Sequence, residues 1–440
     1  MGVGLWARWA TMHGVPRAFM VRQARRGDPL GRLITNHGRG QDPYPMMEAL
    51  RARGPLVRSP FVWATADHRM CREILRDKNF AVTAPSDVEL PKPLRSLLVK
   101  TDPGVANPVE PPAMVVVNPP DHTRYRQLVA RSFTPRATDT LGTRVAEVTW
   151  QLIERLSGSP NPDLIPDFAE QLPVAIIAEI LGLPSDVYGR LLDWGHCGAP
   201  LLDIGIGWKT YRNAIDGLGG IDDFLLEHFR QMRAAGQDGN PFSAMVADDT
   251  LTDRELTANA ALILGAGFET TVNLIGNCIV LLLENPDQLA RLRAEPEWWP
   301  TAVEEILRLD SPVQMTARTA RCDVELAGHR VAEGQMVVLL LGGANRDPGV
   351  FVDPARFDVT RSNARDHLAF ASGIHACLGA ALARIEGVTA LRALFEAFPD
   401  LQLAGSPARR GLVNLRGYSR IPVHLGSRRP VAQSASWPGD

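Results

Sequence analysis

Apolar positions recur with a helical period along most of this chain. This spacing predicts helices over 43–52, 66–76, 120–131, 138–156, 166–182, 185–194, 208–235, 252–284 and 298–309. Short strands are expected as a pair within 58–65, around a Ser59-Pro60 turn, and again around 312–341. The pattern therefore predicts a mainly α-helical protein with a small β region.

The segment 252–284 is the longest predicted helix. Thr252 and Glu255 have the spacing of a capping box at its start, and Asn285-Pro286 ends it. At 1.5 Å per residue, roughly 32 residues span ~48 Å, enough to cross the molecule. By contrast, 82–112 contains seven prolines and 344–363 is loop-rich. Long irregular stretches of this kind are usually functional or disordered.

Composition excludes several classes of function. The chain has 440 residues, of which 45% are hydrophobic and 22% charged, as in an ordinary globular protein. A net charge of −2 gives no case for nucleic-acid binding. Five scattered cysteines fit a cytoplasmic protein better than a disulfide framework. No run of ~18 apolar residues predicts a transmembrane segment, and no signal peptide is recognised.

Both ends of the chain differ from its body. Residues 1–40 are rich in arginine and contain one acidic residue, Asp28. Interfacial membrane contact and a helix packed on the body would both explain them, and we favour the packed helix. Length alone suggests about three domains, but motifs scattered from His122 to Cys377 would serve one site. We therefore expect a basic extension (1–40), one catalytic domain (41–425) and a disordered tail (426–440).

The most informative stretch of the chain surrounds Cys377. It reads Phe370-Ala-Ser-Gly373-Ile-His375-Ala-Cys377-Leu-Gly379 and precedes an alanine-rich helix expected to begin near Leu378. Three interpretations compete. Most unpaired cysteines are small buried hydrophobic residues. A nucleophilic cysteine needs a base, and His375 is two residues away. An iron ligand needs shielding from water and hydrogen-bond donors directed at the sulfur.

The glycines favour the iron ligand. Gly373 and Gly379 allow positive φ and a close approach of the backbone to a cofactor. The N–H groups of Leu378, Gly379 and Ala380 are expected to point toward the sulfur and, with the helix dipole, to lower the pKa of the thiol. Such donors also tune the potential of a bound iron.

Phe370-x-x-Gly373-x-His375-x-Cys377-x-Gly379 resembles the haem-ligand loop of the cytochrome P450 family, a very specific pattern. The resemblance covers about 40–425. It implies the cytochrome P450 fold, with a single haem b between the long central helix and the helix after the cysteine loop. It also implies Cys377 as the axial iron ligand, with Phe370 and Gly379 beside the cofactor, and 82–112 as a loop that covers the substrate. The departures are mild: Ser372 and Asn118 replace residues common in the family.

The centre of the long predicted helix is Gly265-Ala266-Gly267-Phe268-Glu269-Thr270-Thr271. Two glycines cost ~1 kcal/mol each in a helix, so either a packing contact requires small residues or a local bulge opens a groove for dioxygen. A nucleotide-binding glycine loop is excluded because Thr270 takes the third glycine position and no strand precedes it. The segment resembles the family's oxygen-binding element. Ala266 would then face the haem, and Glu269 and Thr270 would be a catalytic acid–alcohol pair that relays protons.

Glu305-Ile-Leu-Arg308 places opposite charges on one helical face. Alone, such a pair is usually exposed and contributes little. Beside Cys377 it resembles the family's buried Glu-x-x-Arg element, whose third member would be Arg356 in Pro354-Ala-Arg356-Phe357. One carboxylate shared by two guanidinium groups would lock the helix to the loop behind the haem, as structural support.

Haem propionates need cations. His122 and Arg126 lie four residues apart on one predicted helix face, after the helix start Asn118-Pro119-Pro120. Each alone would be an ordinary surface or capping residue. By resemblance, Arg318 and His375 complete the set.

The resemblance implies a haem-thiolate monooxygenase that inserts one atom of dioxygen into an apolar small molecule. No flavin or nicotinamide motif is present, so electrons are expected from a separate ferredoxin and reductase. A peroxide-driven peroxygenase and a non-catalytic haem-binding sensor or carrier are the alternatives, and the Glu269–Thr270 pair argues against both. Fatty acids, sterols, terpenoids and polyketides all fit an apolar pocket.

Two surfaces follow from this interpretation. The expected pocket walls are 82–117, Ile263, Ala266, Gly267, 313–316 and 412–415. The expected docking face for the electron donor is a group of arginines near the cysteine loop, namely Arg124, Arg131, Arg136 and Arg384.

Overall fold

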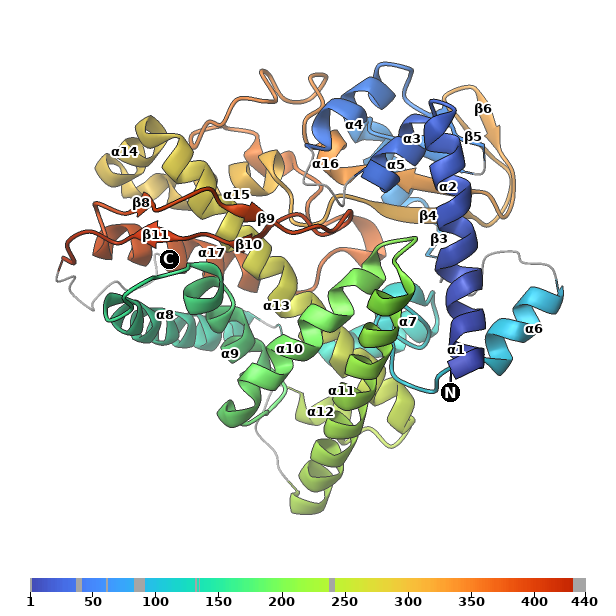
Figure 1. Cartoon of the computed structure of the whole chain (residues 1–440), viewed down its shortest axis with the longest axis horizontal. Coiled ribbons are helices and arrows are strands. Elements are labelled where there is room, and N and C mark those ends of the chain that lie inside the picture. The colour runs from blue at the N-terminus through green and yellow to red at the C-terminus, as the bar shows by residue number, and fades with distance from the viewer. Residues whose placement is uncertain are drawn as a thin grey trace.

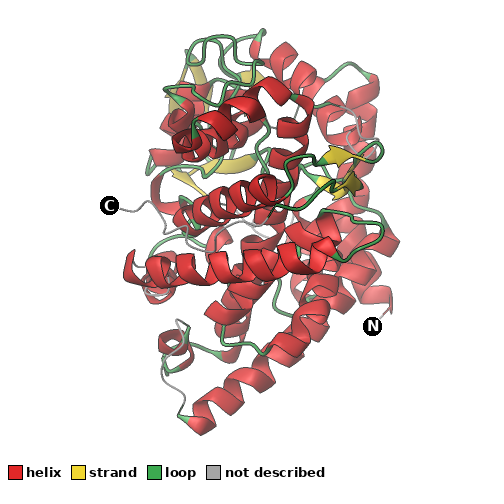
Figure 2. Ribbon diagram, turned by 90° about the vertical axis from the view of Figure 1, so that its left-hand side faces the viewer, coloured by secondary structure: helices red, strands yellow, loops and turns green. Residues whose placement is uncertain are grey.

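The computed structural model describes residues 2–36, 42–60, 62–82, 92–130, 133, 135–236 and 242–429. Helices make up most of this part of the chain (Figures 1 and 2). They are α1 (Gly2–Trp9), α2 (Val15–Arg25), α3 (Pro29–Asn36), α4 (Tyr44–Arg51), α5 (His68–Arg76), α6 (Lys92–Lys100), α7 (Asp121–Ala130), α8 (Pro135–Ser157), α9 (Gln171–Ile180), α10 (Tyr188–Gly198), α11 (Trp208–Ala235), α12 (Ser243–Val246), α13 (Asp253–Glu284), α14 (Pro286–Ala294), α15 (Trp299–Leu309), α16 (Leu341–Ala344) and α17 (Ala380–Ala397).

The strands are short. They are β1 (Val57–Arg58), β2 (Trp63–Thr65), β3 (Phe80–Ala81), β4 (Thr316–Ala320), β5 (Val324–Leu326), β6 (His329–Val331), β7 (Met336–Leu339), β8 (Gln402–Leu403), β9 (Ala408–Arg409), β10 (Tyr418–Arg420) and β11 (Val423–His424). One sheet has the order β1-β2-β7-β4-β3, in which only the β2–β7 pair is parallel. The prediction of a mainly α-helical protein with a small β region is confirmed.

Helix α13 is the central element of the core. It packs against α9, α11, α15 and α17, and Figure 1 shows it passing through the middle of the molecule. The predicted capping box is present: the Thr252 hydroxyl accepts from the Glu255 N–H, and Glu255 accepts from the Thr252 N–H. Among the described helices α13 alone is long and apolar enough to cross a membrane, but 72% of its most apolar window is buried. That burial is typical of a core helix.

Several boundaries differ from the prediction. The irregular stretch 82–112 contains helix α6, while its portion 83–91 lies outside the described residues. The helix expected over 166–182 is divided into a π-helical turn, Ile165–Ala169, and α9, and Pro166 stands at the start of that turn. Helix α14 was not predicted. It starts directly after Asn285, with Pro286 as its first residue.

The N-terminal helices pack on the body, as expected. Helices α1 and α2 are joined by a π-helical turn, Ala10–Gly14. The Arg8 side chain is buried, forms an ion pair with the buried Glu110 and donates to the Leu98 carbonyl at 2.7 Å. The Trp9 indole donates to the Ile206 carbonyl at 2.9 Å. This segment therefore holds together two parts of the chain that precede α7 and α11.

The C-terminal tail is ordered further than predicted. The N–H of Arg429 donates to the Ala397 carbonyl at 2.9 Å, and Arg428 forms an ion pair with Glu154 at 2.5 Å. Residues 426–429 therefore pack on the body, and the rest of the predicted tail lies outside the described residues.

Candidate active site

The loop that carries Cys377 is fixed by its own backbone and by helix α5. The N–H of Cys377 donates to the Phe370 carbonyl at 2.9 Å, and a 3₁₀ turn, Gly373–His375, lies between them. Gly373 has a φ of +75°, and a Cβ there would lie 2.3 Å from the Leu75 carbonyl oxygen. The glycine is therefore required for a close approach to α5, whereas the sequence suggested an approach to a cofactor.

Two observations indicate an interior hollow at Cys377. Cys377 has accessible surface, yet burial raises the pKa of its thiol, so the surface it exposes is surrounded by protein. The Gly379 N–H donates to the sulfur, and Arg126 and Arg384 also favour the thiolate. The predicted donor effect is present at Gly379, whose N–H lowers the pKa of the thiol. The net pKa is nevertheless raised, because desolvation is the largest of these effects.

Four basic groups from three distant segments meet beside this loop. The rings of His122 and His375 lie 4.1 Å apart between centroids, and the Nε2 atom of each is buried without a hydrogen-bond partner. Arg126 donates to the Ala376 carbonyl at 2.8 Å. Arg318 is 5% exposed and donates to Thr316 Oγ1 and to the Ala317 carbonyl.

Electrostatics shows that this group of four lacks an anion. Burial, aided by repulsion from His122, Arg318 and Arg126, lowers the pKa of His375 to about 3. Burial lowers the pKa of Arg318 to about 10. Within the described part of the chain, no carboxylate pairs with any of the four. Two orphaned imidazole nitrogens and two unpaired guanidinium groups fit the propionates of a haem, and the adjacent sulfur fits its iron.

The centre of α13 has one exposed residue. Ala266 is exposed, whereas Ile263, Leu264, Phe268 and Glu269 around it are buried. The Thr270 hydroxyl donates to the Ala266 carbonyl at 2.8 Å. A Cβ on Gly267 would lie 2.7 Å from the Ile177 side chain, so Gly267 packs on α9 and does not line the pocket. The helix is continuous, so the predicted bulge is also wrong, and one of the two glycines has the packing role that we considered.

Glu269 is buried and connected to the surface. Arg410 forms an ion pair with one of its oxygens, and the other oxygen is 3.9 Å from His196 Nε2. His196 also bonds Glu170 at 2.9 Å, which raises the pKa of the imidazole, and its side chain is 40% exposed. A row of titratable groups thus runs from solvent to α13. No local sequence signal points to His196 or Arg410, because both are far from Glu269 along the chain.

The Glu305 carboxylate is shared by two guanidinium groups, but the second is not the predicted one. Arg308 donates to it at 2.7 and 2.8 Å, and both side chains are fully buried. The second donor is Arg361, at 3.0 and 3.1 Å. Arg356 is exposed and contributes its backbone carbonyl, which accepts from Arg308 and Arg361. The assignment of Arg356 is therefore corrected to Arg361, which follows the motif by five residues.

The predicted docking arginines are engaged elsewhere. Arg124 pairs with Glu255 and donates to the Thr250 carbonyl. Arg384 donates to Glu304 at 2.6 Å and lies over the Phe370 ring. Arg131 lies outside the described residues, as does the side chain of Arg136. Arg124 and Arg384 are therefore paired within the protein, and the other two arginines of the predicted face are not tested by the described residues.

Two of the predicted pocket-wall segments, 313–316 and 412–415, contact each other. Val313 pairs with Leu415 in an isolated bridge, and the Gln314 N–H donates to the Asn414 carbonyl at 2.9 Å. The buried Asp203 carboxylate accepts from the N–H groups of Val413 and Asn414 at 2.7 and 2.8 Å. This contact ties the loop before α11 to the wall.

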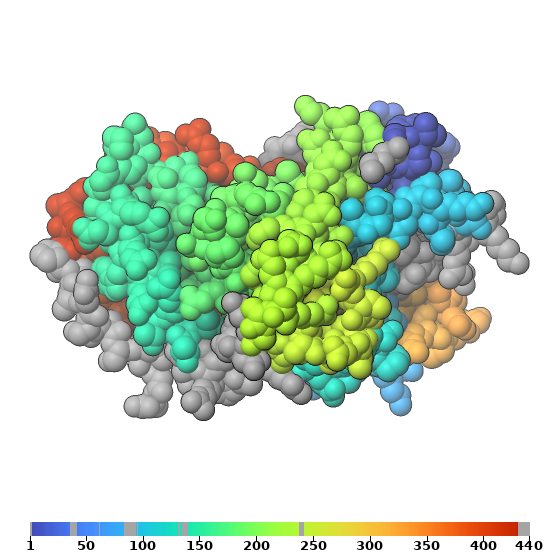
Figure 3. Space-filling view, turned by 90° about the horizontal axis from the view of Figure 1, so that it is seen from below, coloured from blue at the N-terminus to red at the C-terminus, as the bar shows by residue number. Residues whose placement is uncertain are grey.

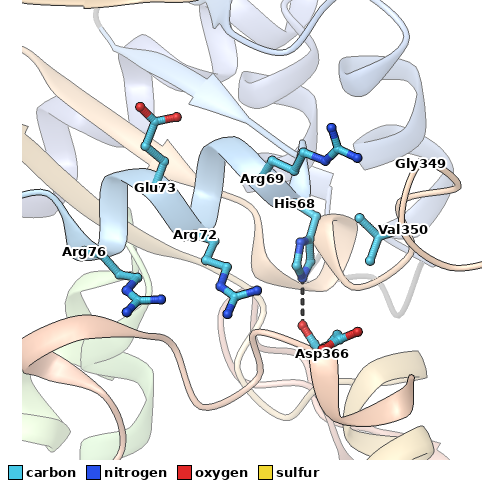
Figure 4. A pocket seen from close by; sticks show the side chains of 8 residues that line it. All are labelled: His68, Arg69, Arg72, Glu73, Arg76, Gly349, Val350 and Asp366. Carbon is cyan, nitrogen blue, oxygen red and sulfur yellow. Dashed lines mark hydrogen bonds between the residues drawn. The ribbon is translucent and has the colours of Figure 1, made fainter. Parts of the chain in front are cut away.

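An open basic pocket of about 500 Å³ lies along α5 (Figure 4). Arg69, Arg72 and Arg76 line it from α5, and the described residues supply no ion pair to them. The remaining lining residues are His68, Glu73, Gly349, Val350 and Asp366. Because α5 also contacts the cysteine loop at Gly373, this pocket lies outside the hollow but close to Cys377.

The fold and this site fit a haem enzyme, and comparison with known proteins identifies its family. The family model "Cytochrome P450" matches residues 204–297 and 300–403. The "Putative cytochrome P450 140" of Mycobacterium tuberculosis is 46% identical over 430 residues, which cover 96% of this chain and 98% of that protein. The chain therefore belongs to the cytochrome P450 family and is a monooxygenase with a haem cofactor.

The names of two further similar proteins mention a substrate or a ligand. The "Vitamin D(3) 25-hydroxylase" of Pseudonocardia autotrophica is 36% identical over 407 residues, covering 88% of this chain and 95% of that protein. The crystal structure of P450BioI in complex with hexadec-9Z-enoic acid ligated acyl carrier protein has a TM-score of 0.79 and 34% identity. It covers 87% of this chain and 98% of that chain.

The group formed by Glu305, Arg308 and Arg361 can be tested with a matched pair of variants. Arg361→Ala leaves a buried carboxylate short of one partner, so it should lower the free energy of unfolding by about 3 kcal/mol. Arg356→Ala removes an exposed side chain and should change it by less than about 0.5 kcal/mol. Denaturant unfolding of both holoproteins, with the haem-to-protein ratio, checks this. Equal losses for the two variants would contradict the assignment of Arg361.

Proposed function

We propose that this enzyme uses haem b, takes electrons from a ferredoxin and its reductase in the cytoplasm, and oxidises an apolar small molecule. The catalytic domain would span 41–425. The observation that carries the proposal is the hollow in which an accessible sulfur, Cys377, lies beside four basic groups without an anion.

The chain's own residues suit the cofactor. Cys377 would hold the iron, while His122, Arg126, Arg318 and His375 would hold the propionates. The Gly379 N–H would moderate the charge on the sulfur, and Phe370 would shield it. When bound, haem iron with a thiolate ligand supplies the activation of dioxygen that no amino-acid side chain provides.

Protons would reach the reaction through the row of titratable groups that ends at α13. His196 is partly exposed and would exchange protons with water. Its Nε2 lies 3.9 Å from a Glu269 oxygen that has no hydrogen-bond partner among the described residues, so a bridging water would complete the transfer. Thr270 is the next hydroxyl group on the helix, one residue from Glu269 and bonded to the Ala266 carbonyl. Arg410 holds Glu269 in place through an ion pair. Thr270 would deliver the proton, and Glu269 and His196 would resupply it.

An apolar substrate is supported by two kinds of observation. Ile263, Ala266, Val313 and Leu415, which belong to the expected pocket walls, are all apolar, and Val313 pairs with Leu415. The names printed for two relatives contain vitamin D(3) and a long-chain fatty acid, both largely apolar. We infer a substrate of that general class.

Electrons would arrive at the α5 pocket, which replaces the docking face expected from the sequence. Its three arginines are solvent-exposed and unpaired within the described chain. Ile374, in the cysteine loop next to α5, is 56% exposed. A basic rim beside an exposed apolar side chain suits an acidic partner protein, because charge steers encounter and apolar contact holds the complex.

Turnover under labelled dioxygen tests the proposed function. A ligand is first found by screening apolar compounds for a shift in the haem spin state, and the holoenzyme is then supplied with ferredoxin, reductase and NADH under ¹⁸O₂. We expect one labelled atom in the product and the other in water. Product formed with hydrogen peroxide but never with ferredoxin would show a peroxygenase. Failure under both conditions would leave a haem carrier or sensor.

Thr270→Ala should uncouple NADH oxidation from product formation. With the hydroxyl gone, proton delivery loses its last donor, and product per NADH should fall about tenfold, equivalent to ~1.4 kcal/mol. Hydrogen peroxide should account for the lost electrons. Thr270→Ser keeps the hydroxyl and should retain most of the coupling. Full coupling in the alanine variant would remove Thr270 from the relay.

Reversing charge in the α5 pocket should slow reduction of the iron. Arg69→Glu with Arg72→Glu is expected to lower the rate of ferredoxin-driven reduction by about tenfold at low salt and less at high salt, since salt screens exposed charges. The control is Arg291→Glu with Arg330→Glu, the same charge change at exposed arginines of other elements. Equal rates for both double variants, in stopped-flow reduction, would place docking elsewhere.

A further inference from the structure

Exposed large hydrophobic side chains concentrate at one corner of the molecule. Among the described residues eleven such side chains are exposed, and eight of them belong to α1, α2, α6 and the 3₁₀ turn Ala199–Leu202 with the loop that follows it. They are Val3, Trp6, Val15, Phe19, Leu94, Val99, Leu202 and Ile204. Single exposed apolar residues are ordinary, but a concentration of them marks an interaction surface. We name these elements the N-terminal corner.

Direct contacts join the three parts of the N-terminal corner. A Cβ added to Gly4 on α1 would lie 3.6 Å from Cγ2 of Thr101, directly after α6, which is ordinary van der Waals contact. Arg17 on α2 donates to the Gly205 carbonyl at 3.2 Å. Figures 1 and 3 both show the blue N-terminal helices beside cyan α6. The exposed side chains therefore come from adjoining elements.

The buried face of the N-terminal helix fixes which face points outward. Arg8 cannot leave the interior without leaving the buried Glu110 carboxylate unpaired. The ring of His13 lies 5.2 Å from that of Tyr211, and both residues are buried. By contrast, Val3 and Trp6 are 85% and 51% exposed. The apolar face is thus presented by rigid packing.

The N-terminal corner is also strongly basic. Five exposed arginines lie on α2 or directly after it, on the way to and within α3, namely Arg17, Arg22, Arg25, Arg26 and Arg32. The acidic residue in the segment is Asp28, which already accepts from the Gly31 N–H at 2.6 Å and the Ser59 hydroxyl at 3.0 Å. Lys100 adds a cation at the end of α6. The surface therefore combines apolar side chains with net positive charge.

We propose that the N-terminal corner docks on an anionic lipid bilayer. Along the helices, exposed apolar residues come first, from Val3 to Phe19, and basic residues follow, from Arg22 to Arg26. Such a helix lies in the membrane interface with tryptophan and aliphatic side chains among the headgroups and arginines on anionic lipids. A second copy of the chain fits less well, because a symmetric dimer would bring two sets of arginines together. This peripheral contact goes beyond the proposed function and does not depend on it.

Flotation with lipid vesicles tests the proposal. The full-length holoprotein is mixed with vesicles of phosphatidylcholine alone, or of equal parts phosphatidylcholine and phosphatidylglycerol. We expect binding to the second kind at low salt and weaker binding as salt is raised. Val3→Glu with Trp6→Glu, and separately Arg22→Glu with Arg25→Glu and Arg26→Glu, should each lower the bound fraction at least about tenfold.

Controls separate this surface from general adsorption. Val352→Glu changes a side chain that is 79% exposed on another element, and Arg291→Glu with Arg330→Glu changes charge elsewhere. Both should bind as the wild type does, and haem absorption confirms that every variant is folded. Absence of binding to anionic vesicles would overturn the proposal. The proposal would also be overturned if only the arginine variants lost vesicle binding, because that result indicates non-specific electrostatic adsorption. If the protein does not bind vesicles but associates with itself, and Trp6→Glu abolishes this association, the surface is a dimer interface and the membrane proposal is overturned.

Discussion

A cysteine sulfur held in a desolvated hollow is the constraint on which the rest of this structure depends. Burial raises the pKa of Cys377, and the groups that favour its anion are one N–H, from Gly379, and the more distant Arg126 and Arg384. A bound metal cation would offset this loss of solvation and favour the thiolate. The unpaired basic groups around His375 show the complementary imbalance. Both are resolved by one cofactor that brings a cation for the sulfur and anions for the bases.

Holding one sulfur in a fixed place requires a scaffold behind it. The Glu305 carboxylate joins Arg308 on α15 to Arg361, and Arg308 also donates to the carbonyls of Asn345 and Pro354 at 2.9 and 2.8 Å. These charge-assisted bonds are buried, so they fix geometry more firmly than exposed ion pairs would. Gly373 then lets the loop approach α5. Glu305, Arg308, Arg361 and Gly373 therefore support the cysteine loop without taking part in the chemistry.

Features whose chemistry is local could be predicted from the sequence, and those that depend on partners far along the chain could not. The cysteine loop, the capping box of α13 and Glu305–Arg308 are each encoded within ten residues, and the structure shows each of them. Arg361, Arg410 and His196 meet their carboxylates only through the fold. The sign of the pKa shift at Cys377 was missed for a similar reason, because desolvation depends on all surrounding elements. Gly267 shows that one sequence feature can serve packing where function was expected.

The central claim is that Cys377 holds haem iron as a thiolate. It is tested most directly by the absorption spectrum of the reduced carbon monoxide adduct of the purified holoprotein. We predict the strongly red-shifted Soret band of a thiolate-ligated haem, and its loss in Cys377→His while haem remains bound through the basic groups. A wild-type adduct without that band, or a Cys377→His adduct that retains it, would contradict the claim.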